Sequence, residues 1–545
     1  MNFKMLARTL LALLALFVLN ASLAFGNVWP SPRVRWVNAF SVEVAVCVLL
    51  LAAVLRKRER IHRGILGLVW LVLVIGHYID VTAPGLYGRD FNIYWDSRHL
   101  ANVAAMLTRD VPWSTLLVVV GGTLIGLAAG FAVVWLCLRF VTAAMKDELP
   151  RRAFAVAALI LVSLFTAQHL VPGFPTRIPF ADPVTGSFAR QARYVAGMIG
   201  PNRLAPALGS SPALDVQLEE LRGADVLLIF LESYGAVTFD NPEFANTLAK
   251  SREVLASEIS AAGRQVASAY VESPTFGGSS WLAHLSLLSG VEVRDEYANV
   301  SLMSQNRQTL VTTFALNGYR TVALMPGIRQ EWPEGAFYKF DVIYNFDSME
   351  YTGPKFGWWS IPDQYTLAKL DARELGTESR APVFAVFPTA TTHAPFGPVA
   401  PYQPDWARML TSTPYDKSDL EPALAAVPSL TNLSPSYLRA VSYEYESLAG
   451  YVRQHAKDNQ VVIVIGDHQP AAAVSGRNAP WDVPVHVIAS DSIIMERLLN
   501  EGFSKGLTPR HPALGKMHSL VPMFLNAFGS NHTDNTRSRR AATTD

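Results

Sequence analysis

Cysteine is nearly absent from this chain: Cys47 and Cys137 are the only two among 545 residues, and both lie in apolar segments of the first third. The polar remainder therefore has no disulfide, no thiolate metal site and no cysteine nucleophile. An excess of one charge is also missing, because 46 basic and 45 acidic residues give a net charge of +1. This balance gives no indication of a nucleic-acid partner.

Apolar sequence, by contrast, is abundant. Half of the residues are hydrophobic, and the excess is concentrated in residues 1–171. Five apolar segments occur there, most of them close to the length that spans a bilayer: 9–25, 37–55, 64–79, 113–138 and 153–171. We therefore expect an all-α membrane domain of five transmembrane helices over residues 1–171.

The basic residues of the loops predict the orientation of these helices. Arg56–Arg63 follows the second segment, and Arg139–Arg152 joins the fourth to the fifth. Both loops, together with Lys4 and Arg8, are expected on the cytoplasmic side. Five crossings then place the chain after residue 171 outside the cytoplasm. As an alternative, the first segment and Ala21–Ala24 also fit a cleavable signal peptide, whose removal leaves the downstream topology unchanged.

The polar part of the chain begins with an expected linker. Residues 172–224 are rich in Pro, Gly, Ala and Ser, and we expect helices there that lie on the membrane. From residue 225 to residue 529, strand-like runs alternate with helical patterns, which predicts an α/β domain with a mostly parallel sheet and helices on both faces. The expected strands are 226–231, 266–271, 320–325, 382–388, 461–465 and 485–489. Residues 530–545 are polar and are expected to be disordered.

Two of the expected strands end abruptly in side chains that bind metals. Val226–Leu231 is followed by Glu232, and Val461–Gly466 is followed by Asp467 and His468. A run that is apolar on both faces is typical of a buried parallel strand, and ligands in open α/β sheets bind beyond the carboxyl ends of such strands. Oxygen and nitrogen ligands of this kind suit one divalent metal ion, Mn, Mg or Zn.

A third motif places hydroxyl groups at the start of an expected helix. Gly277 and Gly278 precede Ser279 and Ser280, and an apolar helical stretch follows. A hydroxyl at a helix N-terminus, with free amides nearby, is well placed to bind a phosphate or an alkoxide, although a serine N-cap is a common alternative. Because neighbouring helical residues differ by about 100°, both hydroxyls cannot face one metal, and we predict that Ser279 does.

A fourth motif follows another apolar strand. The segment Phe387–Phe396 contains Thr392 and His393. A single histidine in such a position is more often structural than catalytic, so this motif alone assigns no role.

In this order, the four motifs resemble those of the alkaline phosphatase/sulfatase superfamily, and in particular its membrane-anchored lipoteichoic acid synthase and phosphoethanolamine transferase group. The five preceding apolar segments also match that architecture. The resemblance implies an alkaline-phosphatase-like domain in which Glu232, Ser279, Asp467 and His468 bind one divalent metal. It further implies that Ser279 is the nucleophile and that His393 lies near the transferred phosphate.

The sequence departs from the patterns of this superfamily. The nucleophile of the membrane-anchored group is usually threonine, whereas here it is Ser279, with Ser280 and Thr275 as alternatives. The Cys/Ser-x-Pro-x-Arg signature of soluble sulfatases is absent, which disfavours sulfatase chemistry. The stretch Trp359–Asp363 resembles a further tryptophan-to-aspartate motif of the group, to which we assign a structural role.

The residues that would hold the substrate differ as well. Lipoteichoic acid synthases carry a Trp-x-Arg phosphate clamp, but the arginine is missing around Trp332. We expect Arg329 or Arg477 to replace it and assign Arg329, Trp332 and Arg477 to substrate binding. A further histidine that the phosphoethanolamine group often carries beyond the Asp-His pair is also absent.

The resemblance implies a metal-dependent transferase in a bacterial inner membrane, with its catalytic domain outside the cytoplasm. Such an enzyme moves a phosphoryl-linked headgroup, phosphoglycerol or phosphoethanolamine, from a membrane phospholipid to a glycan or lipid of the cell envelope through a phospho-serine intermediate. The alternative enzyme is a metal-dependent phosphodiesterase or other hydrolase, with water as the acceptor. The alternative without catalysis is an inactive relative that serves as an envelope-assembly scaffold.

Overall fold

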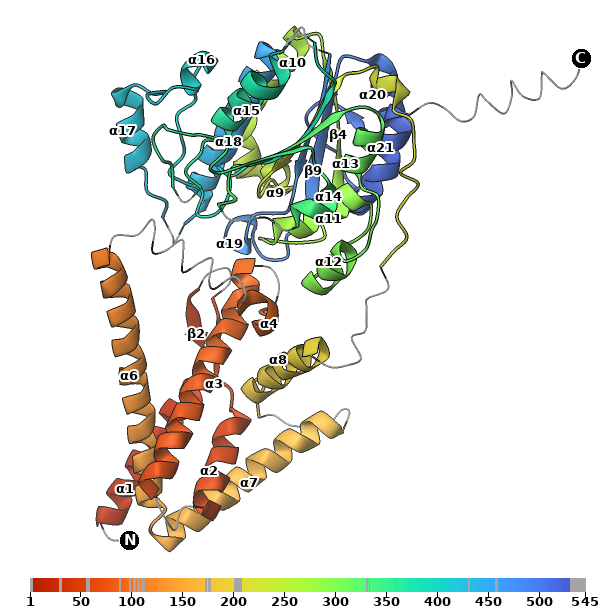
Figure 1. Ribbon diagram of the computed structural model, residues 1–545. Helices are drawn as coiled ribbons and strands as arrows, with labels where there is room; N and C mark the ends of the chain where they lie inside the picture. The colour runs from red at the N-terminus through yellow and green to blue at the C-terminus, as the bar shows by residue number, and fades with distance from the viewer. Residues whose placement is uncertain are drawn as a thin grey trace, which may run out of the picture. The chain divides into compact units, whose positions relative to one another are not determined.

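The computed structural model divides into two compact units, Met1–Leu204 and Ala205–Asp545, each with its own hydrophobic core (Figure 1). The described residues are 3–28, 32–54, 59–87, 90–97, 100, 104, 108, 113–171, 174, 178–199, 208–329, 332, 334–357, 359–377, 379–429, 432–455 and 459–529. Part of the basic loop, residues 56–58, and the predicted disordered tail, residues 530–545, lie outside them.

The first unit consists mainly of apolar helices. Four of them are long and apolar enough to cross a membrane: α1 (Phe3–Ala21), α3 (Glu59–Tyr87), α6 (Trp113–Ala144) and α7 (Glu148–Leu170). This is one span fewer than predicted, because among the described residues the second predicted segment forms the shorter helix α2 (Val42–Val54). Its 13 residues extend about 20 Å, whereas the hydrocarbon core of a bilayer is about 30 Å thick. The other elements are β1 (Phe25–Asn27), β2 (Val34–Trp36), α4 (Ile93–Asp96) and α8 (Val184–Ile199).

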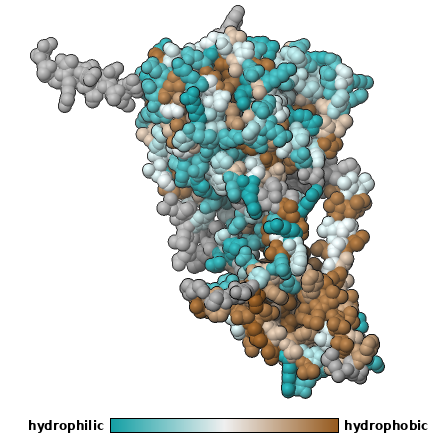
Figure 2. Space-filling view, turned by 180° about the vertical axis from the view of Figure 1, so that it is seen from behind, coloured by the Kyte–Doolittle hydropathy of each residue, from teal (hydrophilic) through white to brown (hydrophobic). Residues whose placement is uncertain are grey.

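The outer faces of these helices are apolar. On α6, Leu117, Val118 and Ile125 are 70%, 74% and 72% exposed, and Figure 2 shows hydrophobic residues gathered over the surface of this unit, whereas the surface of the second unit is mostly hydrophilic. Residues such as Leu19 and Leu138 are buried in a core shared by several helices. Helices that are apolar both inside and outside are typical of a membrane-spanning domain.

Helix α8 lies in the segment that the sequence predicts as a linker, and it packs against α3. Ser187 and Arg190 of α8 donate hydrogen bonds to the Asp80 carboxylate of α3 at 2.6 and 2.8 Å. The Thr185 backbone N–H donates to Glu43 of α2 at 3.0 Å. These contacts give partners to two acidic side chains on apolar helices, which would be costly to bury alone.

The second unit is built on one eight-stranded sheet, with the order β10-β4-β9-β8-β3-β7-β5-β6. Its strands are β3 (Asp225–Leu231), β4 (Gln265–Glu272), β5 (Arg320–Met325), β6 (Val342–Asn345), β7 (Val383–Pro388), β8 (Gln460–Gly466), β9 (Asp482–Ala489) and β10 (Ser504–Lys505). The five strands from β8 to β6 are parallel, and β4 has the same direction beyond the antiparallel strand β9. The predicted α/β class with a mostly parallel sheet is therefore confirmed; β6 and β10 are strands that the sequence pattern missed.

Helices cover both faces of this sheet (Figure 1). One face is packed by α11 (Ser280–Ser289), α13 (Leu310–Leu316), α20 (Ser492–Asn500) and α21 (Leu520–Phe528). The other is packed by α10 (Pro242–Ala261), α15 (Asp363–Leu370) and α18 (Ser434–Gln454). Shorter elements are α9 (Val237–Asp240), α12 (Glu296–Met303), α14 (Gly335–Tyr338), α16 (Trp406–Met409), α17 (Lys417–Ala425), α19 (Ala472–Ser475) and the single turns Glu219–Leu221, Asp371–Leu375 and Met517–Ser519.

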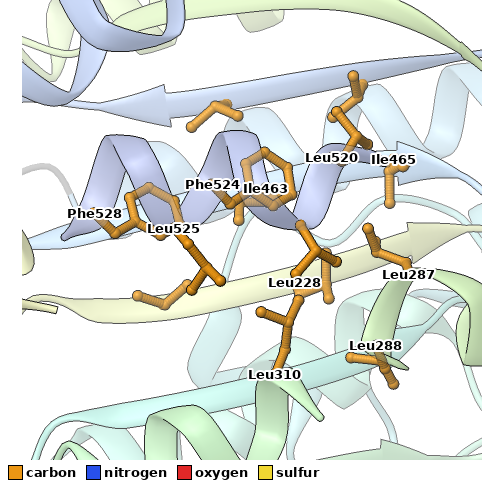
Figure 3. Packing of buried hydrophobic residues seen from close by; sticks show 14 of the residues in the cluster. Leu228, Leu287, Leu288, Leu310, Ile463, Ile465, Leu520, Phe524, Leu525 and Phe528 are labelled. Atoms are coloured by element: carbon orange, nitrogen blue, oxygen red, sulfur yellow. The ribbon is translucent and has the colours of Figure 1, made fainter. Parts of the chain in front are cut away.

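Strand β3 shows why a central strand is apolar on both faces. All of its residues are buried. Val226 and Leu228 belong to the core that includes α21, whereas Leu227 and Ile229 belong to the core that includes α18. Figure 3 shows Leu228 together with Phe524 of α21 in the first of these cores. Because successive side chains of a strand point to opposite faces, a sheet with two covered faces needs this continuous apolar run.

A buried polar network crosses the second of these cores. His486 of β9 lies between the Ser268 hydroxyl, at 2.6 Å from Nδ1, and the Tyr234 hydroxyl, at 3.0 Å from Nε2. Tyr234 in turn contacts the Tyr445 hydroxyl at 2.7 Å. Burial, together with the positive charge of Arg252, lowers the pKa of His486 to about 3, so this imidazole is neutral near neutral pH.

The neutral state of His486 predicts a specific loss of stability in acid. Because its folded-state pKa is below the ordinary value of 6.5, the unfolded chain binds more protons than the folded chain as the pH falls below 6.5. Between pH 6.5 and about pH 5, the wild type should lose about 2 kcal/mol of unfolding free energy that His486→Gln does not lose. Denaturant titrations of the full chain in detergent at both pH values measure this difference, and a constant difference would show that His486 titrates normally.

Candidate metal centre and active site

The two predicted metal-binding stretches meet because their strands are neighbours. β3 and β8 are parallel, with Leu231 opposite Gly466, so the residues that follow them emerge at one edge of the sheet. Gly466 is required there, since a Cβ at this position would lie 1.8 Å from the Tyr234 carbonyl oxygen. The next residues, Glu232 and Asp467, are both buried.

Glu232, Asp467 and His468 form one compact group, called the metal group below. One ligand atom from each residue lies within 4.8 Å of the others. His468 Nε2 is 3.4 Å from Glu232 Oε1 and 3.8 Å from Asp467 Oδ2. The sequence placed all three in one site, and the structure brings them together.

Hydrogen bonds orient the side chains of the metal group so that their free ligand atoms face one another. Asp467 Oδ1 accepts the backbone N–H groups of Ser233 and His468 at 2.8 and 2.7 Å, whereas Oδ2 is buried and has no hydrogen-bond partner among the described residues. His468 Nδ1 lies 2.7 Å from the Gln469 carbonyl oxygen, so it carries the proton and leaves the Nε2 lone pair facing the carboxylates. An orphaned carboxylate oxygen and a free imidazole nitrogen at one point fit a divalent metal ion.

The electrostatics of the metal group also favour a cation. Burial and the nearby charge of Glu232 raise the pKa of Asp467 to about 7. Burial alone would lower the pKa of His468, but the charges of Asp467 and Glu232 raise it. Both shifts have the same physical cause, since two buried carboxylates in contact attract any positive charge. A metal ion of charge +2 would supply that charge.

The hydroxyl that reaches the metal group is Ser280, not Ser279. Ser280 Oγ donates a hydrogen bond to Glu232 Oε2 at 2.9 Å and lies 3.2 Å from His468 Nε2. Ser279 is the N-cap of α11, and its side chain makes no capping hydrogen bond. The third candidate, Thr275, donates to the Gly278 carbonyl oxygen at 2.6 Å. Among the described residues, Ser280 is thus the candidate hydroxyl with a hydrogen bond to the metal group, whereas the sequence led us to predict Ser279 there.

The physical reason is the conformation of the turn before α11. Gly277, Gly278 and Ser279 have φ values of 67°, 152° and 62°. Three consecutive positive φ values reverse the chain direction before the helix begins, so the first helical residue, Ser280, meets the metal group. The two glycines adopt this conformation without steric cost, whereas Ser279 is held in the left-handed region that a non-glycine residue rarely occupies.

His393 lies beside the metal group on the turn after β7. Its imidazole is half-buried, and burial and the charge of His468 lower its pKa. Nδ1 is 2.9 Å from the Ala394 carbonyl oxygen, so the neutral ring carries its proton on Nδ1 and has an accepting Nε2. The ring also meets the Trp359 indole edge-on at 4.6 Å. A pocket of about 30 Å³ lies against these two rings.

The three residues predicted for substrate binding lie in different environments. Arg329 donates to the Ser360 hydroxyl at 2.8 Å and lies over the Phe346 ring. Trp332 stacks on Tyr338 at 5.8 Å and packs against the core. Arg477 is exposed on the turn after α19. Of the three, Arg329 lies beside Ser360, which adjoins the Trp359 of the His393 pocket.

The sequence analysis missed His284, one helical turn after Ser280. Its Nε2 is buried and has no hydrogen-bond partner among the described residues. Burial lowers its pKa to about 4, with opposing influences of Asp467 and His468. The spacing of four residues puts Ser280 and His284 on one face of α11. This spacing is visible in the sequence and could have identified His284.

The metal group predicts the effect of removing one carboxylate. Asp467→Asn should lower the affinity for Mn²⁺ by at least about 100-fold, because the remaining ligands cannot complete the coordination shell. The same change removes a buried charge, so the melting temperature of the metal-free variant should not fall. Mn²⁺ titrations of the full chain in detergent, with thermal melting, measure both effects.

The matched control for this experiment is Glu496→Gln, which changes an exposed acid on α20. This variant should bind Mn²⁺ as the wild type does, and Mn²⁺ should raise its melting temperature by the same amount. A metal-dependent rise that persists in Asp467→Asn would show that the assigned ligands are wrong.

No family model and no curated protein matches the chain. Among solved structures, it is similar to a protein in the alkaline phosphatase superfamily from Vibrio parahaemolyticus, with 17% identity, a TM-score of 0.37, and coverage of 61% of this chain and 71% of that one. It is similar to the integral membrane lipooligosaccharide phosphoethanolamine transferase A (EptA) from Neisseria meningitidis, with 13% identity, a TM-score of 0.43, and coverage of 89% and 87%.

A third similar structure is the phosphoglycerol transferase GacH from Streptococcus pyogenes, in complex with sn-glycerol-1-phosphate. The identity is 12%, the TM-score is 0.33, and the match covers 59% of this chain and 91% of that one. Of these three structures, one is described as a protein in the alkaline phosphatase superfamily and the other two as transferases.

Proposed function

We propose that this chain is a membrane-bound, metal-dependent transferase. It moves a phosphoryl-linked headgroup, phosphoglycerol or phosphoethanolamine, from a membrane phospholipid to a glycan or lipid of the cell envelope. One observation carries the proposal: a serine hydroxyl lies at hydrogen-bond distance from two of the three side chains of a buried Glu-Asp-His group. A hydroxyl in such a position is a nucleophile rather than a structural cap.

We propose Ser280, in place of Ser279, as that nucleophile. Glu232, Asp467 and His468 would hold the metal. When bound, this ion, Mn, Mg or Zn, would stabilise the deprotonated serine oxygen and the charge that develops on the phosphoryl group. Glu232 Oε2, which accepts the Ser280 O–H, orients the hydroxyl for attack.

The proposed reaction has two transfers. First, a bond forms between Ser280 Oγ and phosphorus, the bond from phosphorus to the lipid oxygen breaks, and diacylglycerol leaves with the proton that Ser280 gives up. Then the acceptor oxygen forms its bond to phosphorus, the bond from phosphorus to Ser280 Oγ breaks, and the proton that the acceptor hydroxyl gives up returns to Ser280. His393 is suited to carry the proton in both transfers, because its lowered pKa keeps it neutral with an accepting Nε2.

The membrane unit gives this chemistry its setting. Its four candidate spans and the shorter helix α2 anchor the chain in a bilayer, which raises the effective concentration of the second unit near lipid donors. Lys4, Arg8 and the basic residues between 139 and 152 favour a cytoplasmic location for the loops that carry them. These basic residues agree with one another only when α2 is a fifth crossing, and with that crossing we place the second unit outside the cytoplasm of a bacterial inner membrane.

Whether α2 crosses the membrane decides this orientation and is testable. With five crossings, a reporter enzyme fused after residue 200 is active only outside the cytoplasm. With four crossings and the same N-terminal side, it is cytoplasmic. We expect an external readout after residue 200 and a cytoplasmic readout for a control fusion at Lys146, in the turn between α6 and α7. A cytoplasmic readout after residue 200 together with an external readout at Lys146 would show four crossings and would refute the lipid-donor proposal.

The nucleophile assignment is tested with two neighbouring serines. Ser280→Ala should lower turnover of a nitrophenyl phosphodiester by roughly a thousandfold or more, as the loss of a covalent nucleophile does. Ser279→Ala, the matched control, should stay within a few-fold of wild type. Incubation with phospholipid followed by peptide fragmentation should place the phosphate-linked mass on Ser280.

Different outcomes of this experiment separate the competing functions. Mass on Ser279 or Thr275 would refute the choice of residue but not the mechanism. Release of headgroup to water, even with an added glycan acceptor, would indicate a hydrolase. Turnover that is unchanged in Ser280→Ala would exclude a covalent serine mechanism, and metal binding without any turnover would indicate a scaffold.

A further inference from the structure

The turn that carries His393 is held by a buried carboxylate from another element. Asp363, the first residue of α15, accepts the backbone N–H of Ala390 through Oδ1 at 2.9 Å and that of Thr391 through Oδ2 at 2.7 Å. Asp363 is 0% exposed. Both of its oxygens are thus used for consecutive backbone groups, which fixes the position and the direction of this turn.

A second buried carboxyl group contacts the first. Glu444 of α18, which is 2% exposed, lies close enough to Asp363 for each carboxyl group to affect the pKa of the other, and the Thr391 side chain affects both pKa values. The Glu444 Oε1 atom has no hydrogen-bond partner among the described residues. An unpartnered oxygen is far less costly on a neutral carboxyl group than on a charged one.

Two carboxyl groups in contact inside a protein cannot both be charged, so they share one proton. Asp363 receives hydrogen bonds from two N–H groups, which stabilise its charged form. The proton therefore belongs to Glu444, which donates it toward Asp363. In agreement, burial and the charge of Asp363 raise the pKa of Glu444 well above its ordinary value.

The same turn is bonded to the metal group at its other end. Thr389 accepts the Glu232 backbone N–H through its hydroxyl at 3.1 Å and donates its own N–H to the Phe230 carbonyl oxygen at 2.9 Å. The short segment from Thr389 to His393 is therefore attached both to strand β3 and to Asp363.

We infer that Asp363 and Glu444 are a proton-sharing positioning pair, which holds the turn after β7 so that His393 faces the metal group. Neither residue touches the reacting atoms; they act through the backbone of Ala390 and Thr391. The catalytic part of this inference rests on the proposed function of His393, whereas the positioning part does not.

The two members of the pair should respond differently to the same chemical change. Asp363→Asn places an amide N–H₂ against a backbone N–H group, so one of the two hydrogen bonds becomes repulsive and the turn moves. Glu444→Gln keeps a donor directed at Asp363 and mimics the protonated acid. If both residues were needed as carboxylates, for instance around a cation, the two variants would be equally impaired.

The experiment uses the full chain in detergent with Mn²⁺ and a nitrophenyl phosphodiester. Asp363→Asn should lower kcat by about 100-fold, the cost of a small misplacement of a catalytic group, with KM and Mn²⁺ occupancy close to wild type. Glu444→Gln and the control Glu446→Gln, an exposed acid on the same helix, should retain wild-type kcat. Equal losses in Asp363→Asn and Glu444→Gln would overturn the inference.

A second measurement does not depend on turnover. In protein labelled with ¹⁵N-histidine, the His393 resonances are those lost in His393→Gln. They should shift in Asp363→Asn and stay in place in Glu444→Gln, even if the proposed function fails. Should Asp363→Asn not fold, Thr391→Val, which removes the hydroxyl that affects the pKa of both acids, should shift the same resonances with a smaller loss of kcat. Unshifted His393 resonances in the folded variants would overturn the positioning role.

Discussion

The structure of the second unit depends on one costly arrangement, the burial of two carboxylates and an imidazole at the ends of neighbouring strands. Glu232 and Asp467 are each at most 7% exposed, and charges in such surroundings persist only when hydrogen bonds and opposite charge compensate for the lost water. The central strands supply part of this compensation, since the backbone after β3 and β8 donates to Asp467. Asp467 Oδ2 has no hydrogen-bond partner among the described residues, so a cation could supply the rest of the compensation.

The elements around the metal group are fixed by packing rather than by the group itself. Behind it, Tyr437 of α18 donates to the Ser233 carbonyl oxygen at 2.8 Å, and Tyr234 enters the network of His486. Each of these side chains is buried in a core. A rigid surrounding of this kind holds ligands that repel one another in place without the metal, which is the condition for rapid metal binding and for a defined nucleophile position.

The sequence predicted those parts of the site that follow from periodicity. Continuous apolar runs identified β3 and β8, and because parallel neighbours end at one edge, Glu232, Asp467 and His468 were placed together. Ser280 was not placed with them, because its orientation depends on the positive φ of Ser279. A serine in the sequence does not predict a positive φ. The contact of Asp363 with Ala390 joins residues 27 positions apart, and no local pattern reports such a contact.

This unit contains two pairs of buried acids, and the negative charge of each pair must be balanced in a different way. Glu232 and Asp467 converge on one point with an imidazole, so a metal ion can balance their charge. Asp363 and Glu444 have no such third ligand in contact, and a single proton balances them instead. If the pair shares a proton as inferred above, that proton stays bound with or without metal, and the turn of His393 would keep its position. A metal-held turn, in contrast, would move whenever the ion exchanged.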